Sequence, residues 1–323
     1  MKNILMMKGA RTLLDNCARV KAGESVLIIT DMNMKPSIAE VLAAAAAERG
    51  AEPIIMIIRP RLTHGQEPPA NVAEAMKKAE VIFTPVSTSI THTRAIKEAA
   101  EAGARALVMT AFTEELLISG PIEADFLKQM PICKAVAEVF QKGKKAHLTT
   151  PMGTDLKLNL EGRRGNALTS IVGPGQFSTT PTIEANFSPV EGSAEGTIVA
   201  DASIPYLNIG VLEEPVRVKV DKGFIVDIQG GHQARIIGDN LASQKDPNCY
   251  NIAELGVGLN PAAKICGVML DDEGAFGVVH IGIGTNITLG GVIKAKTHYD
   301  LLMYKSTLVI DGKEVLKDGN LVI

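Results

Sequence analysis

A histidine and an aspartate stand two residues apart in the segment T-H-Y-D-L-L, residues 297–302. On a β-strand, side chains two residues apart point to the same face of the sheet, so His298 and Asp300 would project together while Tyr299 points away. Imidazole and carboxylate are both common metal ligands. The spacing therefore predicts half of a metal site on a strand, which other parts of the chain must complete.

Three further residues of ligand type stand in apolar or glycine-rich surroundings. Glu184 lies in P-T-I-E-A-N-F, Glu254 in I-A-E-L-G-V-G and His280 in V-V-H-I-G-I-G. Buried carboxylates are rare unless they are paired or bound to a metal, which makes Glu254 the most unusual of the three. The other two also have ordinary interpretations: Glu184 could be a cap or a surface residue, and His280 could be a hydrogen-bonded core histidine. His298 and Asp300 alone would also suit a hydrogen-bonded pair.

Taken together, these five imidazole and carboxylate groups suit a site for one or two divalent metal ions. Such a ligand set favours zinc, cobalt, manganese or non-haem iron over calcium or copper(I). Cations between the carboxylates would also offset the cost of burying their charges. The other histidines are less suited: His64 and His92 fall in connections, His147 begins a strand, and His232 precedes a helix, where it could reach a substrate.

The first half of the chain alternates apolar runs with helical patterns. Residues 25–32 form a continuous apolar run, typical of a strand buried on both faces. Residues 36–50 form a helical pattern with Pro at its start and Gly at its end. The alternation continues to about residue 144 and indicates a parallel sheet with helices on both faces. No glycine-rich phosphate-binding motif follows the first run, so the sequence does not indicate nucleotide binding.

From about residue 146 the pattern changes to short strands separated by Gly, Thr and Pro, with one helix at about 233–244. This texture is typical of a mainly antiparallel β, or α+β, domain. We therefore expect an α/β, Rossmann-like domain over residues 1–145 and a mainly β metal-site domain over residues 146–323.

Length and composition suit a globular protein of two domains. The chain has 323 residues, of which 46% are apolar and 21% charged, which is long for a single core. A net charge of −3 gives no electrostatic basis for binding nucleic acid or an anionic membrane. The four cysteines form no CxxC pair, and no apolar run approaches the ~20 residues of a membrane span. The short apolar run of residues 4–7 is broken by Lys8, so we expect no secretory leader. We expect a cytoplasmic protein.

Several segments follow one another in an order that resembles a known family. These are N-I-A-E-L-G-V-G-L-N-P, V-H-I-G-I-G-T-N, a G-G pair and a short H-x-D strand, with P-V-E-G-S-A-E-G-T-I-V-A-D-A-S-I upstream. The order resembles the metal-dependent aminopeptidases of the aminopeptidase T and aminopeptidase S type, the thermophilic-type leucyl aminopeptidases. The resemblance implies an N-terminal α/β domain, a C-terminal domain with a two-metal site, and a homodimer. It also implies that the metal ligands are Glu184, Glu254, His280, His298 and Asp300.

Two features differ from the aminopeptidases. Ile287 stands seven residues after His280, where the resemblance would place a catalytic tyrosine, and the segment before the H-x-D strand is shorter. The compact arrangement of histidine, G-G and H-x-D looks like the related 2,5-dihydroxypyridine 5,6-dioxygenases. In those enzymes, one iron held by two histidines and an aspartate cleaves a ring with O2.

The main expectation is a metal-dependent hydrolase in which metal-activated water attacks a small peptide or amide substrate. One or two zinc, cobalt or manganese ions would serve as cofactor. Glu254 would bridge the metals or take the proton of the water. Tyr299 would act as oxyanion donor in place of the missing tyrosine, with Tyr250 and Tyr304 as further options.

One alternative is a ring-cleaving dioxygenase with a single Fe(II), acting on a dihydroxypyridine-like aromatic. His280, His298 and Asp300 would hold the iron, and the two glutamates would surround it. The presence of both glutamates favours hydrolysis, because a single-iron site does not require them. A second alternative is a non-catalytic protein with a degenerate metal site that binds a small molecule, at the strand ends near Thr30, Asp31 and Thr84.

Overall fold

The computed structural model describes residues 1–91 and 93–323, so His92 lies outside the described residues. The chain divides into two compact units, Met1–Met130 with Leu168–Thr182, and Pro131–Ala167 with Ile183–Ile323. This division departs in two places from the predicted boundary between residues 145 and 146. Helix α6 (Phe126–Lys142) continues into the second unit, where Phe140 packs edge-on against Phe187. Strand β8 (Phe177–Thr179) returns to the first unit because it pairs with β4 (Arg105–Thr110).

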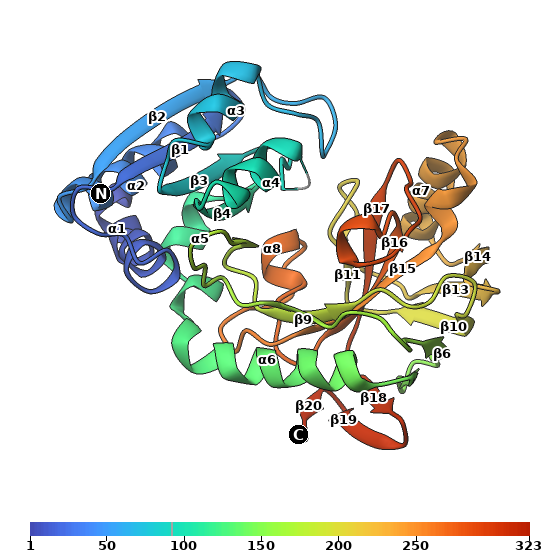
Figure 1. Cartoon of the computed structure of the whole chain (residues 1–323). Helices are drawn as coiled ribbons and strands as arrows, with labels where there is room; N and C mark the ends of the chain where they lie inside the picture. The colour runs from blue at the N-terminus through green and yellow to red at the C-terminus, as the bar shows by residue number, and fades with distance from the viewer. Residues whose placement is uncertain (92) are drawn as a thin grey trace. The chain divides into compact units, whose positions relative to one another are not determined.

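The first unit contains a sheet of five parallel strands in the order β2-β1-β3-β4-β8 (Figure 1). Its other strands are β1 (Ser25–Asp31), β2 (Glu52–Ile58) and β3 (Val81–Val86). Strands β1, β3 and β4 are buried along almost their whole length, as expected where helices cover both faces of a parallel sheet. The predicted α/β fold of the N-terminal region is confirmed.

Most helices of this unit begin at a capping threonine or a proline, whereas the first helix begins after Met1 without either. They are α1 (Lys2–Thr12) with a π-helical turn η1 (Leu13–Cys17), α2 (Pro36–Glu48), α3 (Ala70–Met76), α4 (Arg94–Glu101), α5 (Glu114–Ile118) and η2 (Pro121–Glu123). The hydroxyls of Thr93 and Thr113 accept hydrogen bonds from the first turns of α4 and α5. Across the described part of the chain, no helix has the length and apolar character needed to cross a bilayer.

A nearly buried ion pair ties the start of β4 to the loop before β1. Arg105 Nη2 lies 2.5 Å from Glu24 Oε2, and Arg105 Nη1 donates to the Arg19 carbonyl. We expect Arg105→Met to lower the free energy of unfolding by about 3 kcal/mol, because it leaves the Glu24 charge without its partner. Urea unfolding followed by circular dichroism measures this change.

Two variants control for this prediction. Lys97→Ala breaks an exposed pair with Glu101 and should change the unfolding free energy by less than about 0.5 kcal/mol. Glu24→Gln added to Arg105→Met should recover part of the loss, because it removes the unpaired charge. A single Arg105→Met variant as stable as the parent would show that the pair contributes nothing.

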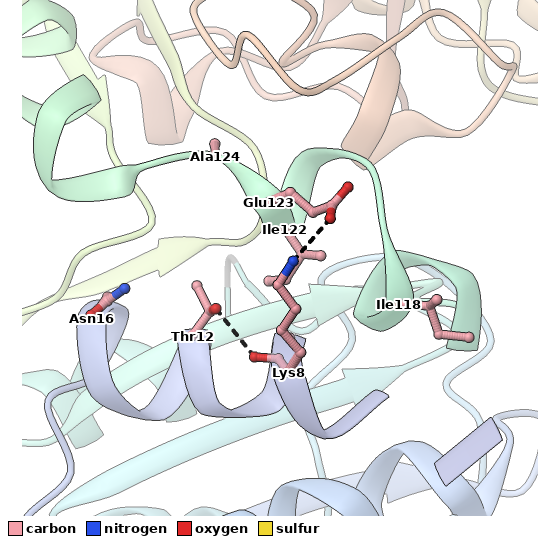
Figure 2. Close-up of a pocket in the computed structure, with 8 residues that line it drawn as sticks. Lys8, Thr12, Asn16, Ile118, Ile122, Glu123 and Ala124 are labelled. Atoms are coloured by element: carbon pink, nitrogen blue, oxygen red, sulfur yellow. Dashed lines mark hydrogen bonds and ion pairs between the residues drawn. The ribbon is translucent and has the colours of Figure 1, made fainter. Parts of the chain in front are cut away.

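A hollow of about 210 Å³ lies in the first unit beside α1 and η2 (Figure 2). Lys8 and Glu123 form an ion pair at 3.1 Å across it, and the Thr12 hydroxyl donates to the Lys8 carbonyl. Among its lining residues there is no group of histidines and carboxylates, so the metal chemistry predicted from the sequence lies elsewhere. A wider groove of about 450 Å³ beside α7 (His232–Ser243), lined partly by Arg235 and Asp239, likewise contains none of the predicted site residues.

The second unit is mainly antiparallel β, as predicted. Its largest sheet has the order β14-β13-β10-β6-β5-β18-β19-β20, and β11 pairs only with β12. These strands are β5 (Lys145–Thr149), β6 (Asp155–Asn159), β10 (Glu195–Ala200), β11 (Ser203–Ile204), β12 (Gly210–Val211), β13 (Val216–Asp221), β14 (Phe224–Gln229), β18 (Thr307–Ile310), β19 (Lys313–Lys317) and β20 (Asn320–Leu321).

A further sheet of this unit, in the order β17-β16-β15-β9-β7, carries all five predicted metal-ligand residues. Its strands are β7 (Asn166–Leu168), β9 (Glu184–Phe187), β15 (Ile252–Gly258), β16 (Val279–Gly284) and β17 (His298–Met303). The short helices of the unit are η3 (Pro247–Tyr250), α8 (Met269–Asp272) and η4 (Ile287–Leu289).

One face of this sheet is a packed apolar core. Leu255, Val257, Ile281 and Ile283 are fully buried and alternate with the ligand-type residues along β15 and β16. Helix α6 runs past β9 (Figure 1), and its contact with Phe187 covers this face. The apolar face holds the strands rigid, which leaves the opposite face for the polar residues.

Candidate metal centre

On the polar face of the sheet, each ligand-type residue stands opposite a glycine of the neighbouring strand. Residues opposite one another in an antiparallel pair share a face. The register gives the pairs Glu184 with Gly258, Glu254 with Gly282, His280 with Gly256, His298 with Gly284 and Asp300 with Gly282. The side chains therefore lean over positions that have no side chain of their own.

At two of these positions, any residue other than glycine would collide with the polar side chains. A Cβ added to Gly282 would lie 2.8 Å from Glu254 Cβ and 2.9 Å from both Asp300 Oδ1 and His298 Cε1. A Cβ on Gly256 would overlap the imidazole ring of His280. Glycine at these positions thus creates the room in which the polar side chains meet.

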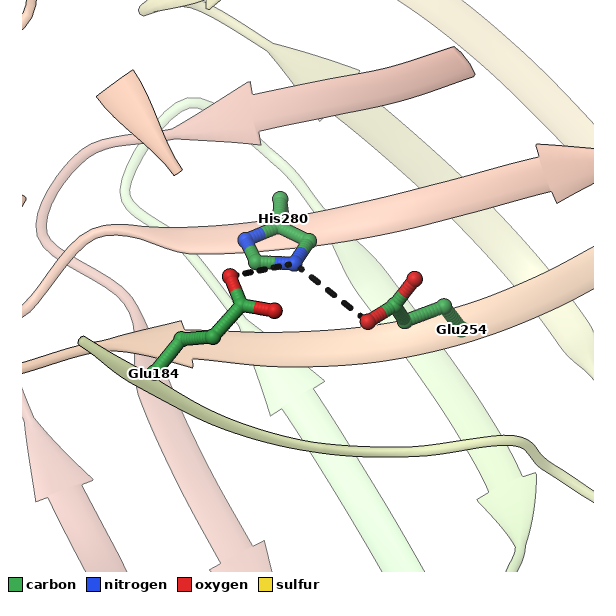
Figure 3. Close-up of side chains that lie close together, drawn as sticks. All are labelled: Glu184, Glu254 and His280. Carbon is green, nitrogen blue, oxygen red and sulfur yellow. Dashed lines mark ion pairs between the residues drawn. The ribbon is translucent and has the colours of Figure 1, made fainter. Parts of the chain in front are cut away.

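The five side chains form two groups that share one member. Ligand atoms of Glu184, Glu254 and His280 lie within 4.8 Å of one another, and so do those of Glu254, His298 and Asp300. His280 Nε2 is 3.7 Å from an oxygen of each glutamate, as Figure 3 shows. His298 Nε2 is 3.0 Å from Glu254 Oε2 and 3.5 Å from Asp300 Oδ1. Glu254 therefore stands at the centre of the cluster.

Several nitrogen and oxygen atoms of the cluster face its interior and are not used in hydrogen bonds to the surrounding backbone or amide groups. His298 Nδ1 lies 2.7 Å from the Thr285 carbonyl, which can only accept, so Nδ1 carries the hydrogen and Nε2 stays available. Asn186 donates to Glu184 Oε1. The other Glu184 oxygen, Oε2, and Asp300 Oδ1 are buried without a hydrogen bond. Buried carboxylate oxygens without donors fit a cation, which would give them a partner.

The pKa values of the cluster are strongly displaced. Burial raises the pKa of Glu184 to about 7. Burial acts in the same direction on Asp300, but His298 and His280 outweigh it and hold the pKa of that carboxyl well below its usual range. Displaced pKa values in a set of converging groups are typical of functional sites.

The tyrosine chosen from the sequence points away from the cluster. The Tyr299 hydroxyl donates to Asn240 Oδ1 at 3.0 Å, because Tyr299 lies on the opposite face of β17 from His298 and Asp300. The structure therefore does not bring Tyr299 to the site as an oxyanion donor. Tyr304 is exposed.

Two residues near Asp300 were missed by the sequence analysis. The Tyr206 hydroxyl lies 2.6 Å from Asp300 Oδ2 and 2.8 Å from Glu273 Oε1. Burial, and then the Asp300 charge, raise the pKa of Glu273 well above its usual range. Tyr206 follows β11, whose proximity to β17 no spacing reveals, and Glu273 belongs to the acidic run D-D-E-G, which resembles an exposed turn.

Three of the remaining polar candidates have local partners, whereas the Thr84 hydroxyl is buried without a hydrogen bond among the described residues. Asp31 accepts hydrogen bonds from Ser87 and from the Asn33 amide. His64 accepts from the Ser89 amide, and His147 pairs with Asp155 at 2.8 Å. His232 begins α7. These contacts account for Asp31, His64 and His147 as structural residues.

A family model described as 2,5-dihydroxypyridine 5,6-dioxygenase (NicX) matches residues 6–323 of the chain. A curated 2,5-dihydroxypyridine 5,6-dioxygenase of Pseudomonas putida is 30% identical over 161 residues, which are 46% of this chain. The match spans 45% of that relative, less than half of its length.

Two solved structures have a similar fold over almost the whole chain. The 2,5-dihydroxypyridine dioxygenase from P. putida KT2440 superposes with a TM-score of 0.86 at 21% identity, over 99% of this chain and 97% of that one. Wild-type AmpT from Thermus thermophilus superposes with a TM-score of 0.71 at 17% identity, over 99% of both chains. At these identities the likeness shows a shared fold.

Proposed function

Because the chain belongs to the 2,5-dihydroxypyridine 5,6-dioxygenase family, we propose that it opens a dihydroxypyridine-like ring with O2. The observation that carries the proposal is that His280, His298 and Asp300 lie on one glycine-lined face of a sheet, where Glu254 links the group of His280 to the group of His298 and Asp300. Two histidines and one carboxylate are the ligand set of many non-haem iron oxygenases.

The expectation of an aminopeptidase-like metallohydrolase is wrong. The family match covers nearly the whole chain and is to a dioxygenase, which contradicts hydrolase, metalloprotease and proteolysis as descriptions of this protein. The similarity to AmpT lies in the fold, and it explains why the order of segments resembled the aminopeptidases.

We propose His280, His298 and Asp300 as the residues that would hold one Fe(II). When bound, Fe(II) would allow electrons to pass from an electron-rich ring to O2, and this ligand set would leave coordination positions open for both. His298 is already oriented for the task, because the Thr285 carbonyl fixes the hydrogen on Nδ1. Asp300 presents Oδ1, which has no hydrogen bond within the protein.

Glu254 is proposed to position the two histidines and to accept a proton. Its two oxygens face different rings, Oε1 towards His280 and Oε2 towards His298, so the carboxylate holds both imidazoles in place. If a ring hydroxyl of the substrate lay beside these residues, the buried Glu254 carboxylate would be placed to receive its proton. Glu184 borders the same space from β9.

Anaerobic loading with Fe(II) tests this function. We expect one iron per chain at saturation, and one O2 consumed per 2,5-dihydroxypyridine opened, followed by an oxygen electrode and loss of ring absorbance. Protein loaded with zinc should leave the ring intact, because zinc has no redox chemistry. An iron-loaded enzyme that consumes no O2 with this substrate, or turnover by the zinc form without O2, would contradict the proposal.

A further inference from the structure

We infer that Tyr206 and Glu273 form a hydrogen-bonded pair that positions Asp300 for the metal, a role that rests on the metal site of the proposed function. Both are positioning residues, because they act through Asp300. The inference uses their contacts and the way the chain holds them together.

The Tyr206 hydroxyl lies between two carboxyl groups. Its oxygen is 2.6 Å from Asp300 Oδ2 and 2.8 Å from Glu273 Oε1. The phenol donates to Asp300 Oδ2, the shorter of the two contacts, and Glu273 contacts the hydroxyl from its other side.

Asp300 is the member of this pair of carboxyl groups that belongs to the metal-ligand cluster, whereas Glu273 lies outside both groups. Tyr206 donates to Asp300, and Glu273 acts on Asp300 through its contact with the Tyr206 hydroxyl. This chain fixes Asp300 Oδ2 and turns the free Oδ1 towards the cluster.

Tyr206 and Glu273 come from two segments that hydrogen bonds hold next to each other. Tyr206 lies in the turn between β11 and β12, and Glu273 directly follows α8. The Ser203 hydroxyl of β11 donates to Asp272 Oδ2 at 2.5 Å, and Asp272 also accepts from the Cys266 and Gly267 amides. Asp272 is fully buried. This carboxylate therefore fixes the turn that carries Tyr206 next to the helix that precedes Glu273.

The turn itself has an unfavourable backbone. Leu207 and Asn208 have φ values of 57° and 56°, in the left-handed region. Leucine rarely adopts this conformation, which costs on the order of 1 kcal/mol or more. The Ile209 amide closes the turn onto the Tyr206 carbonyl. Strain of this kind persists where the surrounding contacts hold it, and here it presents the Tyr206 hydroxyl to Asp300.

Cobalt(II) binding to the metal-free full chain tests the inference without using turnover. We expect Tyr206→Phe to weaken cobalt affinity by about 10- to 100-fold and to alter the ligand-field spectrum, as changes behind a metal ligand usually do. Glu273→Gln should bind cobalt nearly as the parent does, because its amide group can still form a hydrogen bond with the phenol in place of the carboxyl group. Glu273→Leu should bind as weakly as Tyr206→Phe.

Tyr299→Phe is the matched control. Its ring centroid is 5.2 Å from that of Tyr206, but its hydroxyl contacts Asn240, so cobalt affinity should stay within about twofold. Parental affinity and spectrum in Tyr206→Phe would overturn the inference, and so would equal losses in Glu273→Gln and Glu273→Leu. A parent protein that binds cobalt and shows this pattern of variants, but opens no ring with iron, would refute the proposed function and leave the positioning role standing.

Discussion

His298→Ala is expected to lower ring-opening turnover by about 10³-fold, because a metal ligand supplies several kcal/mol of stabilisation and each 1.4 kcal/mol is tenfold in rate. His298 Nε2 is within 3.5 Å of both Glu254 and Asp300. The substitution therefore removes the imidazole from the ligand group formed by Glu254, His298 and Asp300. Iron content and oxygen uptake, measured on the same anaerobically loaded sample, check the result.

His147→Ala serves as the comparison for this variant. His147 lies on β5 and pairs with Asp155 at the surface, outside the cluster, so iron content and turnover should match the parent protein. If His298→Ala retained full iron and more than about a tenth of the parental rate, His298 would not be a ligand.

Gly282→Ala is the second substitution with a large expected effect. A methyl group at this position would press on Glu254, Asp300 and His298 together, at distances of 2.8 and 2.9 Å. Displacing groups that hold a reacting centre by about 1 Å can cost about 10²-fold in rate. We therefore expect turnover to fall by about 10²-fold and iron affinity to fall with it, while the protein remains folded.

Gly238→Ala is a matched control, since Gly238 lies inside α7 and a Cβ there meets nothing within 4 Å. It should leave turnover unchanged and raise the free energy of unfolding by up to about 1 kcal/mol, because alanine favours helix over glycine. Circular dichroism separates a local effect of Gly282→Ala from unfolding. Full activity in folded Gly282→Ala would show that the cluster needs no glycine.

The placement of the cluster was readable from the sequence to a large extent. The two-residue spacing in H-x-D correctly put His298 and Asp300 on one face of β17. The segments E-L-G-V-G and H-I-G-I-G also contained the glycine pairing, because each polar residue is followed by glycines at the same two-residue period. Local periodicity decides these features, so they needed no knowledge of tertiary contacts.

Other features depend on contacts between distant segments. Tyr206 lies 94 residues before Asp300 in the chain, and only the position of β11 near β17 brings them together. The return of residues 168–182 to the first unit was likewise hidden, because β8 rejoins the first sheet after the chain has begun the second unit. Neither event leaves a periodic signal in the sequence.

The reaction was harder to infer than the fold. The presence of Glu184 and Glu254 was taken to favour two metals and hydrolysis, yet the family match is to a dioxygenase. Both chemistries use imidazole and carboxylate ligands, so the residue types restrict the metal more than the reaction. The missing tyrosine at Ile287 was the observation that pointed away from the aminopeptidases.

The glycine-lined polar face of the sheet affects the stability of the folded protein in a cell. Glycines contribute little to strand stability, and the carboxylates they accommodate repel one another when no cation separates them. An ion that binds only the folded sheet stabilises it by mass action. If that ion is the proposed Fe(II), the supply of iron would also govern how much of the folded protein resists proteolysis.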